Sequence, residues 1–329
     1  MGKTALLSKL FSLLKKLNGT VLILIIYVIA VSLLKPSFLS LSNLTNLVRS
    51  VSIVGIMACA ITLVMLTSNT ELSAGSILSF CACISCTFVD TNPFLSVAAP
   101  IIAGACCGLV NGFLVGKVKI NSFVTTLGMS YVYQALALLY TGSRYLITKN
   151  EDGWYKFLGN GYVFGIPMPV IVFAAVALCV IFVQKKTIFG SHIYAVGSNA
   201  TSARFSGINV SNTIMLTYVF GGTAIGISSI IMCSRVMSAQ PYMGSGYEFE
   251  VLTAVVLGGL NVAGGKGTVA GTVLGVIFVG VLKNSFTLLG IPANLSYVGL
   301  GVVLVIAVAN QITKERRSNR VKKRKAISQ

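Results

Sequence analysis

The chain has few charged residues, and acids and histidine are the scarcest of them. Only 10% of its 329 residues are charged, with seven acids and one histidine, whereas soluble domains carry roughly 25%. One histidine excludes a histidine pair for a haem or a catalytic metal, and seven acids leave few groups for a proton relay. The chain has no Gly-x-Ser-x-Gly elbow and no HExxH motif, so hydrolysis and redox chemistry are not indicated. We expect a protein that is not an enzyme and has no metal or other cofactor of its own.

Apolar residues fill most of the chain instead. They make up 55% of it, and the mean hydropathy is +0.87. A soluble protein of this length could not bury so much apolar surface, so the composition predicts an integral protein of the lipid bilayer. We expect an all-α, polytopic fold in one transmembrane domain over residues 1–329, with a basic cytoplasmic N-terminus (1–18) and a basic cytoplasmic tail (312–329).

The formal net charge of +18 raises the question of a nucleic-acid partner. The basic residues lie mainly at the two chain ends and in short loops between apolar stretches, and no basic face is interleaved with aromatic residues. No nucleic-acid binding is therefore expected, and the basic residues are better explained as determinants of membrane topology.

The eight cysteines lie inside or at the edges of apolar segments. The spacing Cys81-x-Cys83-x-x-Cys86 is typical of a metal site, but no fourth ligand and no histidine is near it. We interpret these cysteines as small packing residues, and no disulfide framework is indicated.

The hydropathy pattern predicts about ten transmembrane helices. The eighth is too short for an upright span, which favours a broken or unwound helix there. Residues 35–50 are expected to form an interfacial helix outside the spans. The expected spans are residues 20–34, 51–67, a third that ends near 89, 94–115, 123–140, 167–183, 213–233, 251–260, 269–282 and 297–309.

The charged residues orient this topology, because basic residues prefer short cytoplasmic loops. Ten crossings put both basic termini in the cytoplasm. The basic residues expected inside are those of the two termini with Lys117, Lys119, Lys185, Lys186, Arg204 and Lys266, and the acids expected outside are Asp90, Glu151, Asp152, Glu248 and Glu250. Six basic residues depart from the rule: Lys35, Arg49, Arg144, Lys149, Lys156 and Arg235.

Residues 185–210, KKTIFGSHIYAVGSNATSARFSGINV, form the longest polar interruption in the central part of the chain. A short helix is predicted at 199–206, with Asn199 as its cap and with Ala200, Ala203 and Phe205 available for packing. The residues alone support two interpretations equally: a docking element for another protein, or a solvated loop between the sixth and seventh spans.

Polar residues on or beside the spans are candidates for a solute path, although packing between helices explains them equally well. Glu71 lies at a break between two spans, where it either caps the third helix or takes part in transport. Glycines after the eighth segment permit close backbone approach and a helix break. The path candidates are Glu71, Ser73, Asn111, Ser130 and Gln134, and the glycines are Gly258, Gly259, Gly264, Gly265 and Gly267.

A phosphate-binding loop for ATP would need the pattern G-x-x-x-x-G-K-[ST]. Gly265-Lys266 is the nearest match, but the first position is Leu260 and the residue after the lysine is Gly267. If the protein moves a solute uphill, we therefore expect the energy to come from a separate ATPase chain.

Three long segments in order resemble one family: 108–129 (GLVNGFLVGKVKINSFVTTLGM), 191–210 (SHIYAVGSNATSARFSGINV) and 238–275 (SAQPYMGSGYEFEVLTAVVLGGLNVAGGKGTVAGTVLG). They are similar to permease subunits of bacterial ATP-binding-cassette (ABC) importers for sugars, in the ribose, xylose, galactose and autoinducer-2 branch. The resemblance covers nearly the whole chain. One turn departs from it: the family usually has TGGIDLSVGS where this chain has TSNTELSAGS from Thr67, without the two glycines and with glutamate in place of aspartate.

The resemblance implies a multi-pass permease in the bacterial inner membrane that forms the path for a ribose-like monosaccharide. It implies as partners a second permease in a homodimer or heterodimer, two ATPase subunits that bind the ATP, and an extracytoplasmic sugar-binding protein. The alternative is an ion-coupled secondary transporter or facilitator that acts alone. The resemblance also assigns residues 191–210 to a cytoplasmic region that couples to the ATPase, with these candidate residues: Ser191, His192, Tyr194, Ala195, Gly197, Asn199, Ala203, Arg204, Ser206 and Gly207.

Overall fold

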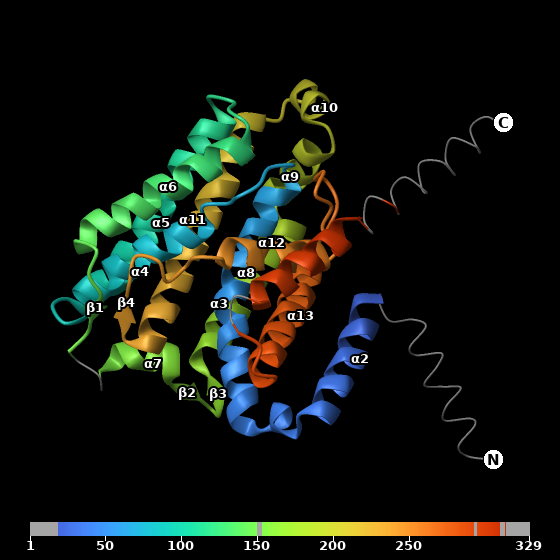
Figure 1. The fold of residues 1–329 in the computed structure, drawn as a ribbon. Coiled ribbons are helices and arrows are strands. Elements are labelled where there is room, and N and C mark those ends of the chain that lie inside the picture. The colour runs from blue at the N-terminus through green and yellow to red at the C-terminus, as the bar shows by residue number, and fades with distance from the viewer. Residues whose placement is uncertain (1–18, 150–152, 293–294, 310–312, 314–329) are drawn as a thin grey trace, which may run out of the picture.

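The computed structural model describes residues 19–149, 153–292, 295–309 and 313. Within them, helices form almost all of the regular structure (Figure 1). Their order is α2 (Gly19–Leu34), η1 (Pro36–Leu39), α3 (Leu41–Leu66), α4 (Ala74–Val89), α5 (Pro93–Gly116), α6 (Ser122–Thr141), α7 (Trp154–Asn160), α8 (Met168–Lys186), α9 (Ile188–Ser198), α10 (Ala200–Phe205), α11 (Val210–Val236), α12 (Tyr247–Leu257) and α13 (Val269–Leu288). A last apolar helix covers Leu295–Ala309.

The all-α, polytopic fold is confirmed. Six of the described helices, α3, α5, α6, α8, α11 and α13, are long and apolar enough to cross a membrane. The other four expected spans coincide with shorter helices, namely α2, α4, α12 and Leu295–Ala309. Because these four have fewer than 18 residues, the count of ten crossings stays a prediction.

Helix α3 forms the centre of the core. Every residue from Val51 to Leu66 is buried. The interfacial helix expected before it is wrong as a separate element, because residues 41–50 are the first turns of α3 itself. The side chain of Ser40 accepts the amide proton of Asn43 at 3.3 Å and caps this helix. No glycine or proline interrupts the chain from Leu41 to Val54, so the helix continues into the span.

Helices α5 and α11 pack at very close range. A Cβ on Gly108 would overlap the carbonyl oxygen of Tyr218, and a Cβ on Gly222 would overlap that of Gly104. Only hydrogen fits at these positions, so the four-residue spacing of small residues in α5 does bring two helix backbones together. The cysteines Cys81, Cys83 and Cys86 of α4 are buried in the core as packing residues.

Short strands and helices lie at the two ends of the bundle (Figure 1). At one end, called the α7 end here, β2 (Tyr162–Val163) and β3 (Ile166–Pro167) form a hairpin beside α7. The strands β1 (Leu146–Ile147) and β4 (Ser238–Ala239) pair near α4 and α11. At the opposite end, the α10 end, α9 packs against α3, α8 and α11, and α10 lies at the outer tip. The two ends therefore differ in construction.

Two acids expected in an outer loop are placed differently by the structure. Glu248 and Glu250 lie in the first turn of α12, and Glu250 is only 3% exposed and forms an ion pair with Lys283 of α13. A helix N-terminus favours carboxylates, and the lysine neutralises the charge. The segment expected outside therefore ends within the first turn of α12, and the side of the membrane that these two acids face stays a prediction. Glu151, Asp152, the N-terminal lysines and the basic residues of the tail lie outside the described residues.

Candidate functional site

The polar segment after α8 folds into two short helices at the α10 end (Figure 1). The hydroxyl of Thr187 caps α9 by accepting the amide proton of Gly190 at 3.1 Å. The side chain of Asn199 caps α10 by accepting from the amide of Ser202 at 2.9 Å. The helix and cap predicted at 199–206 are confirmed. The first helix, α9, was not expected, because its glycines at 190 and 197 resemble those of a loop.

Helix α10 has an inner and an outer face. Ala203 is buried against Val196 and Val210 of the same chain. The side chain of Phe205, in contrast, is 89% exposed. Of the candidate coupling residues, Ser191, Asn199, Arg204, Ser206 and Gly207 are exposed, whereas Ala203 and Gly197 are buried inside the protein. A partner on this face would therefore meet Phe205 and Arg204 rather than Ala203.

The C-terminal end of α9 lies directly against two breaks between helices. A Cβ on Gly197 would overlap the carbonyl oxygen of Leu66 at the end of α3, and would lie 2.7 Å from the amide nitrogen of Gly265. The Gly265 amide donates to the same Leu66 carbonyl at 2.9 Å. The chain segments around α9, α3 and the glycine loop of residues 258–268 are thus held at backbone contact.

The glycine loop connects α12 with α13. Gly259, Gly264, Gly265 and Gly267 all have positive φ, between 68° and 137°, which glycine adopts without steric cost. The hydroxyl of Tyr194 on α9 donates to the carbonyl of Gly267 at 2.6 Å. Burial raises the pKa of the Tyr194 phenol, so this donor keeps its proton at neutral pH. Movement of α9 would therefore pull on the helix break.

The turn of residues 67–73 forms the second break. Ser68 has φ of 65°, a left-handed conformation that costs an L-residue energy. Its hydroxyl lies 2.7 Å from the Ala263 carbonyl and 3.1 Å from that of Gly197. The hydroxyl of Tyr218 on α11 donates to the Thr70 carbonyl at 2.7 Å. Serine thus occupies a position where the related turn has a glycine, and it adds a contact to α9.

A buried hydrogen-bond network joins this turn to α5 and α6. One carboxylate oxygen of Glu71 accepts from the Ser73 amide at 2.7 Å and from the Ser73 hydroxyl at 2.5 Å. The other accepts from the Asn111 side-chain amide at 2.9 Å, and the hydroxyl of Tyr133 donates to the oxygen of that amide at 2.9 Å. Glu71 is 3% exposed, and its partners in this network, Ser73 and Asn111, are polar but uncharged.

Three of the five path candidates therefore lie together: Glu71, Ser73 and Asn111. The other two do not join them. The hydroxyl of Ser130 donates to the Leu127 carbonyl of its own helix at 2.6 Å, and the amide of Gln134 donates to the Pro241 carbonyl at 2.7 Å. Tyr133 was not selected from the sequence. Its position between Ser130 and Gln134, two candidates on the same span, could have identified it. Glu71 lies before the N-cap residue Ser73 and accepts from that residue's own amide and hydroxyl, so it orders the turn before α4 and caps none of the first amides of that helix. A transport role for the cluster stays a prediction.

The ion pair between Glu250 and Lys283 was also missed. It borders a cavity of about 210 Å³ between α3, α12 and α13. The ammonium of Lys283 lies 5.2 Å from the centroid of the Tyr247 ring. Polar side chains of Asn46, Ser50, Asn284 and Thr287 line the same cavity. The sequence could have indicated this pair, because both residues lie in or beside apolar segments. Charged residues in such segments are rarely left unpaired.

Comparison with known families gives one match over most of the chain. Residues 43–308 match the family described as branched-chain amino acid transport system / permease component. The matched region runs from the first turn of α3 almost to the end of the helix Leu295–Ala309, and so includes both helix breaks and α9–α10.

Named relatives match over similar lengths. The ribose import permease protein RbsC of Escherichia coli (strain K12) is 36% identical over 292 residues, which is 87% of this chain and 90% of that protein. The protein of the same name from Bacillus subtilis (strain 168) is 37% identical over 88% of this chain and 91% of its own length. The L-arabinose ABC transporter permease protein AraH of Azospirillum brasilense is 30% identical over 88% of this chain and 86% of its own length. No solved structure gave a match.

Proposed function

Because the chain belongs to the family of permease components described above, we propose that it forms the membrane path of an ABC importer for a ribose-like monosaccharide. The observation that carries the choice of solute is the 36% identity to a ribose import permease over 87% of the chain. A second named relative takes L-arabinose, another five-carbon sugar. The family description mentions branched-chain amino acids, but the relatives named here that specify a solute specify a sugar.

The proposal includes partners that this chain would need. They are a second permease, identical or different, two ATPase subunits that hold the ATP, and an extracytoplasmic sugar-binding protein. We place the α10 end and both termini in the cytoplasm, and the α7 end outside. The exposed side chains Phe205 and Arg204 support an ATPase contact at α10, and the backbone contacts of α9 with both helix breaks support transmission of movement into the bundle.

Reconstitution tests the proposed function. The chain is incorporated into liposomes alone, or with the ATPase and binding protein, and uptake of labelled ribose is followed with ATP or with a non-hydrolysable analogue inside. We expect uptake only with all partners and hydrolysable ATP. Uptake by the chain alone, driven by an ion gradient and indifferent to ATP, would establish the secondary-transporter alternative, which the two buried carboxylates Glu71 and Glu250 favour. In that case Glu71→Gln would change the dependence on the ion gradient.

The coupling surface has its own test. Phe205→Asp places a charge on a side chain that is 89% exposed, so the permease fold should be retained while the apolar contact with the ATPase is lost. We expect co-purification of the ATPase to fall at least tenfold, as is usual for loss of a central aromatic contact. Tyr145→Asp, at an exposed site of the α7 end, is the matched control. Equal co-purification of the ATPase with both variants would contradict the assignment.

A further inference from the structure

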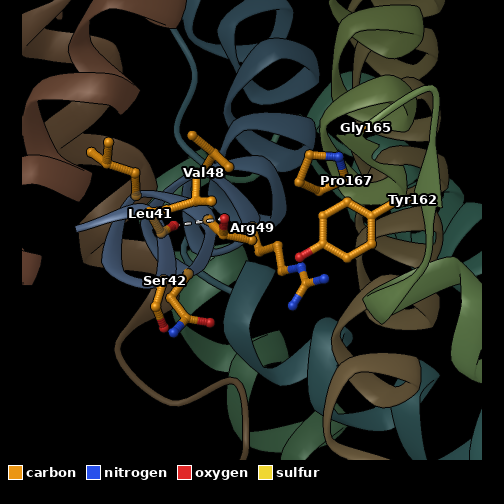
Figure 2. Close-up of a pocket in the computed structure, with 10 residues that line it drawn as sticks. Leu41, Ser42, Val48, Arg49, Tyr162, Gly165 and Pro167 are labelled. Atoms are coloured by element: carbon orange, nitrogen blue, oxygen red, sulfur yellow. Dashed lines mark hydrogen bonds between the residues drawn. The ribbon is translucent and has the colours of Figure 1, made fainter. Parts of the chain in front are cut away.

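A second cavity, of about 740 Å³, lies at the α7 end between the first turns of α3 and the β2–β3 hairpin. Figure 2 shows it with Arg49 and Tyr162 side by side and with Leu41, Val48 and Pro167 around them. Leu44 also lines the wall. The cavity thus combines one guanidinium group with mostly apolar walls. The further inference concerns this cavity and does not depend on which solute the protein carries.

The guanidinium group of Arg49 is held in a fixed position. One terminal nitrogen, Nη2, donates to the carbonyl of Asn160 at 2.6 Å, and the group lies 5.0 Å from the centroid of the Tyr162 ring. Its Nε atom is buried and has no hydrogen-bond partner. A buried donor without a partner costs free energy, so the site is incomplete as it stands.

A second arginine lies in the same network. Nη1 of Arg235 donates to the hydroxyl of Ser50, the residue after Arg49, at 2.7 Å. The side-chain amide of Asn160 donates to the carbonyl of Arg235 at 3.1 Å. Among the described residues, no carboxylate forms an ion pair with either arginine. Two positive charges therefore lie close together without a counter-ion from this part of the chain, on the end where the topology predicts few basic residues.

The surroundings of the cavity are those of a membrane interface. Leu39 and Leu41 are 57% and 82% exposed, and Phe164, at the tip of the hairpin, is fully exposed. Tyrosine is typical of the level where acyl chains meet headgroups, and Tyr162 lines this cavity beside these exposed apolar side chains. Arginine pairs with phosphate through two parallel hydrogen bonds and is less strongly hydrated than lysine.

We propose that this cavity binds an anionic phospholipid, with the headgroup phosphate at Arg49 and an acyl chain along Leu41, Leu44 and Val48. The phosphate supplies acceptors for the guanidinium group of Arg49 and the negative charge that no described carboxylate provides to the two arginines. A zwitterionic lipid would bring a cation next to them, so its binding is weaker. The apolar wall distinguishes a lipid from inorganic phosphate, which has no group to place there.

Native mass spectrometry of the delipidated, detergent-solubilised protein tests this proposal, with phosphatidylglycerol, phosphatidylcholine and inorganic phosphate as separate probes. We expect phosphatidylglycerol to remain bound to the wild type, and Arg49→Gln to weaken it roughly tenfold or more, as for the loss of one charge-assisted pair. Arg49→Lys should restore part of the binding. Val48→Trp, which fills the apolar wall without touching the arginine, should weaken binding too. Arg144→Gln, at an exposed arginine of the same end, is the control and should leave it unchanged.

Three results would overturn the proposal. Phosphatidylcholine that binds as tightly as phosphatidylglycerol would remove the need for an anionic headgroup. Inorganic phosphate that binds as tightly as the lipid would make the cavity a simple anion site. If Arg49→Gln leaves lipid binding unchanged but abolishes binding of the extracytoplasmic sugar-binding protein, the occupant is an acidic side chain of that partner.

Discussion

At the scale of single residues, Ser68 shows how this chain departs from the turn that its relatives favour. Serine holds a left-handed conformation there with φ of 65° and makes contacts to two carbonyl groups. Compared with glycine, serine at this position has less backbone freedom, but its hydroxyl adds a hydrogen bond to the Gly197 carbonyl of α9. The turn is formed without the two glycines of the family pattern, and the hydroxyl of Ser68 contacts the Ala263 carbonyl of the glycine loop.

Two substitutions separate these effects. Ser68→Gly and Ser68→Ala both remove the hydroxyl, so the difference between them reflects the backbone alone. Because alanine in a left-handed conformation costs about 1–2 kcal/mol, we expect Ser68→Ala to be less stable than Ser68→Gly by about 1 kcal/mol. The measurement is the midpoint of heat-induced aggregation in detergent. An alanine variant as stable as the glycine variant would contradict the strained conformation.

The buried ion pair gives an asymmetric prediction. Lys283→Met leaves Glu250 unpaired at 3% exposure, whereas Glu250→Gln leaves a lysine whose side chain is 41% exposed. An unpaired buried charge typically costs about 3–5 kcal/mol, so Lys283→Met should lower the thermal midpoint much more than Glu250→Gln.

The double variant Glu250→Gln with Lys283→Met completes this cycle, and it should recover most of the stability that Lys283→Met loses. Lys186→Met, at an exposed lysine, serves as the control and should have little effect. Equal losses in both single variants, with no recovery in the double variant, would mean that the pair is not a coupled unit.

At the scale of helices, the contact between α5 and α11 depends on missing side chains. A Cβ on Gly108 would overlap the backbone of Tyr218, which cannot move away as a flexible side chain could. Gly108→Ala should therefore force the two helices apart and destabilise the protein by about 1–3 kcal/mol. Gly128→Ala, in α6, meets nothing within 4 Å and should be neutral or stabilising, because alanine favours helices. The two variants are compared by their monodispersity and thermal midpoint in detergent. An equal loss of stability in both would contradict close packing of α5 on α11.

The helices also show what the sequence could predict. The glycines of α5 four residues apart, the cap at Asn199 and the interruption after α12 follow from local patterns, and the structure contains each of them. The continuation of α3 back to Leu41 was missed because the spaced leucines of residues 39–47 resemble the apolar face of an interfacial helix, although nothing there breaks a helix. Helix α9 was missed because Gly190 and Gly197 resemble loop glycines. Their role is to admit the backbones of α8 and α3, which only a tertiary structure shows.

The buried clusters lie further beyond sequence reasoning. Glu71, Asn111 and Tyr133 come from a turn and two helices, and no spacing along the chain relates them. The same holds for Glu250 and Lys283, and for Arg49 with Tyr162. Each residue could be selected as an unusual polar group in an apolar chain, but its partner could not be identified, because partners are set by helix packing.

At the scale of the whole molecule, the segments whose basic residues are expected inside gather at one end. Lys119, between α5 and α6, and Arg204, in α10, line one cavity at the α10 end. The loop that carries Lys266 contacts α9 at Tyr194 and Gly197. At the far side of α4, the side chain of Asp90 accepts the amide proton of Lys149 at 2.9 Å. Three basic loops expected inside therefore meet at one end, and the positive-inside rule predicts that this end faces the cytoplasm.

Cysteine labelling tests that orientation directly. Phe205→Cys and Tyr145→Cys replace side chains that are 89% and 71% exposed at the two ends. The background carries Cys106→Ala and Cys179→Ala, because these are the two exposed native cysteines. In intact cells without the partner subunits, a membrane-impermeant maleimide should label the cysteine at 145 and not the one at 205, and permeabilisation should expose both. Labelling of the cysteine at 205 in intact cells would mean that the protein has the opposite orientation in the membrane. Helix α10 would then lie outside, where it could not contact a cytoplasmic ATPase.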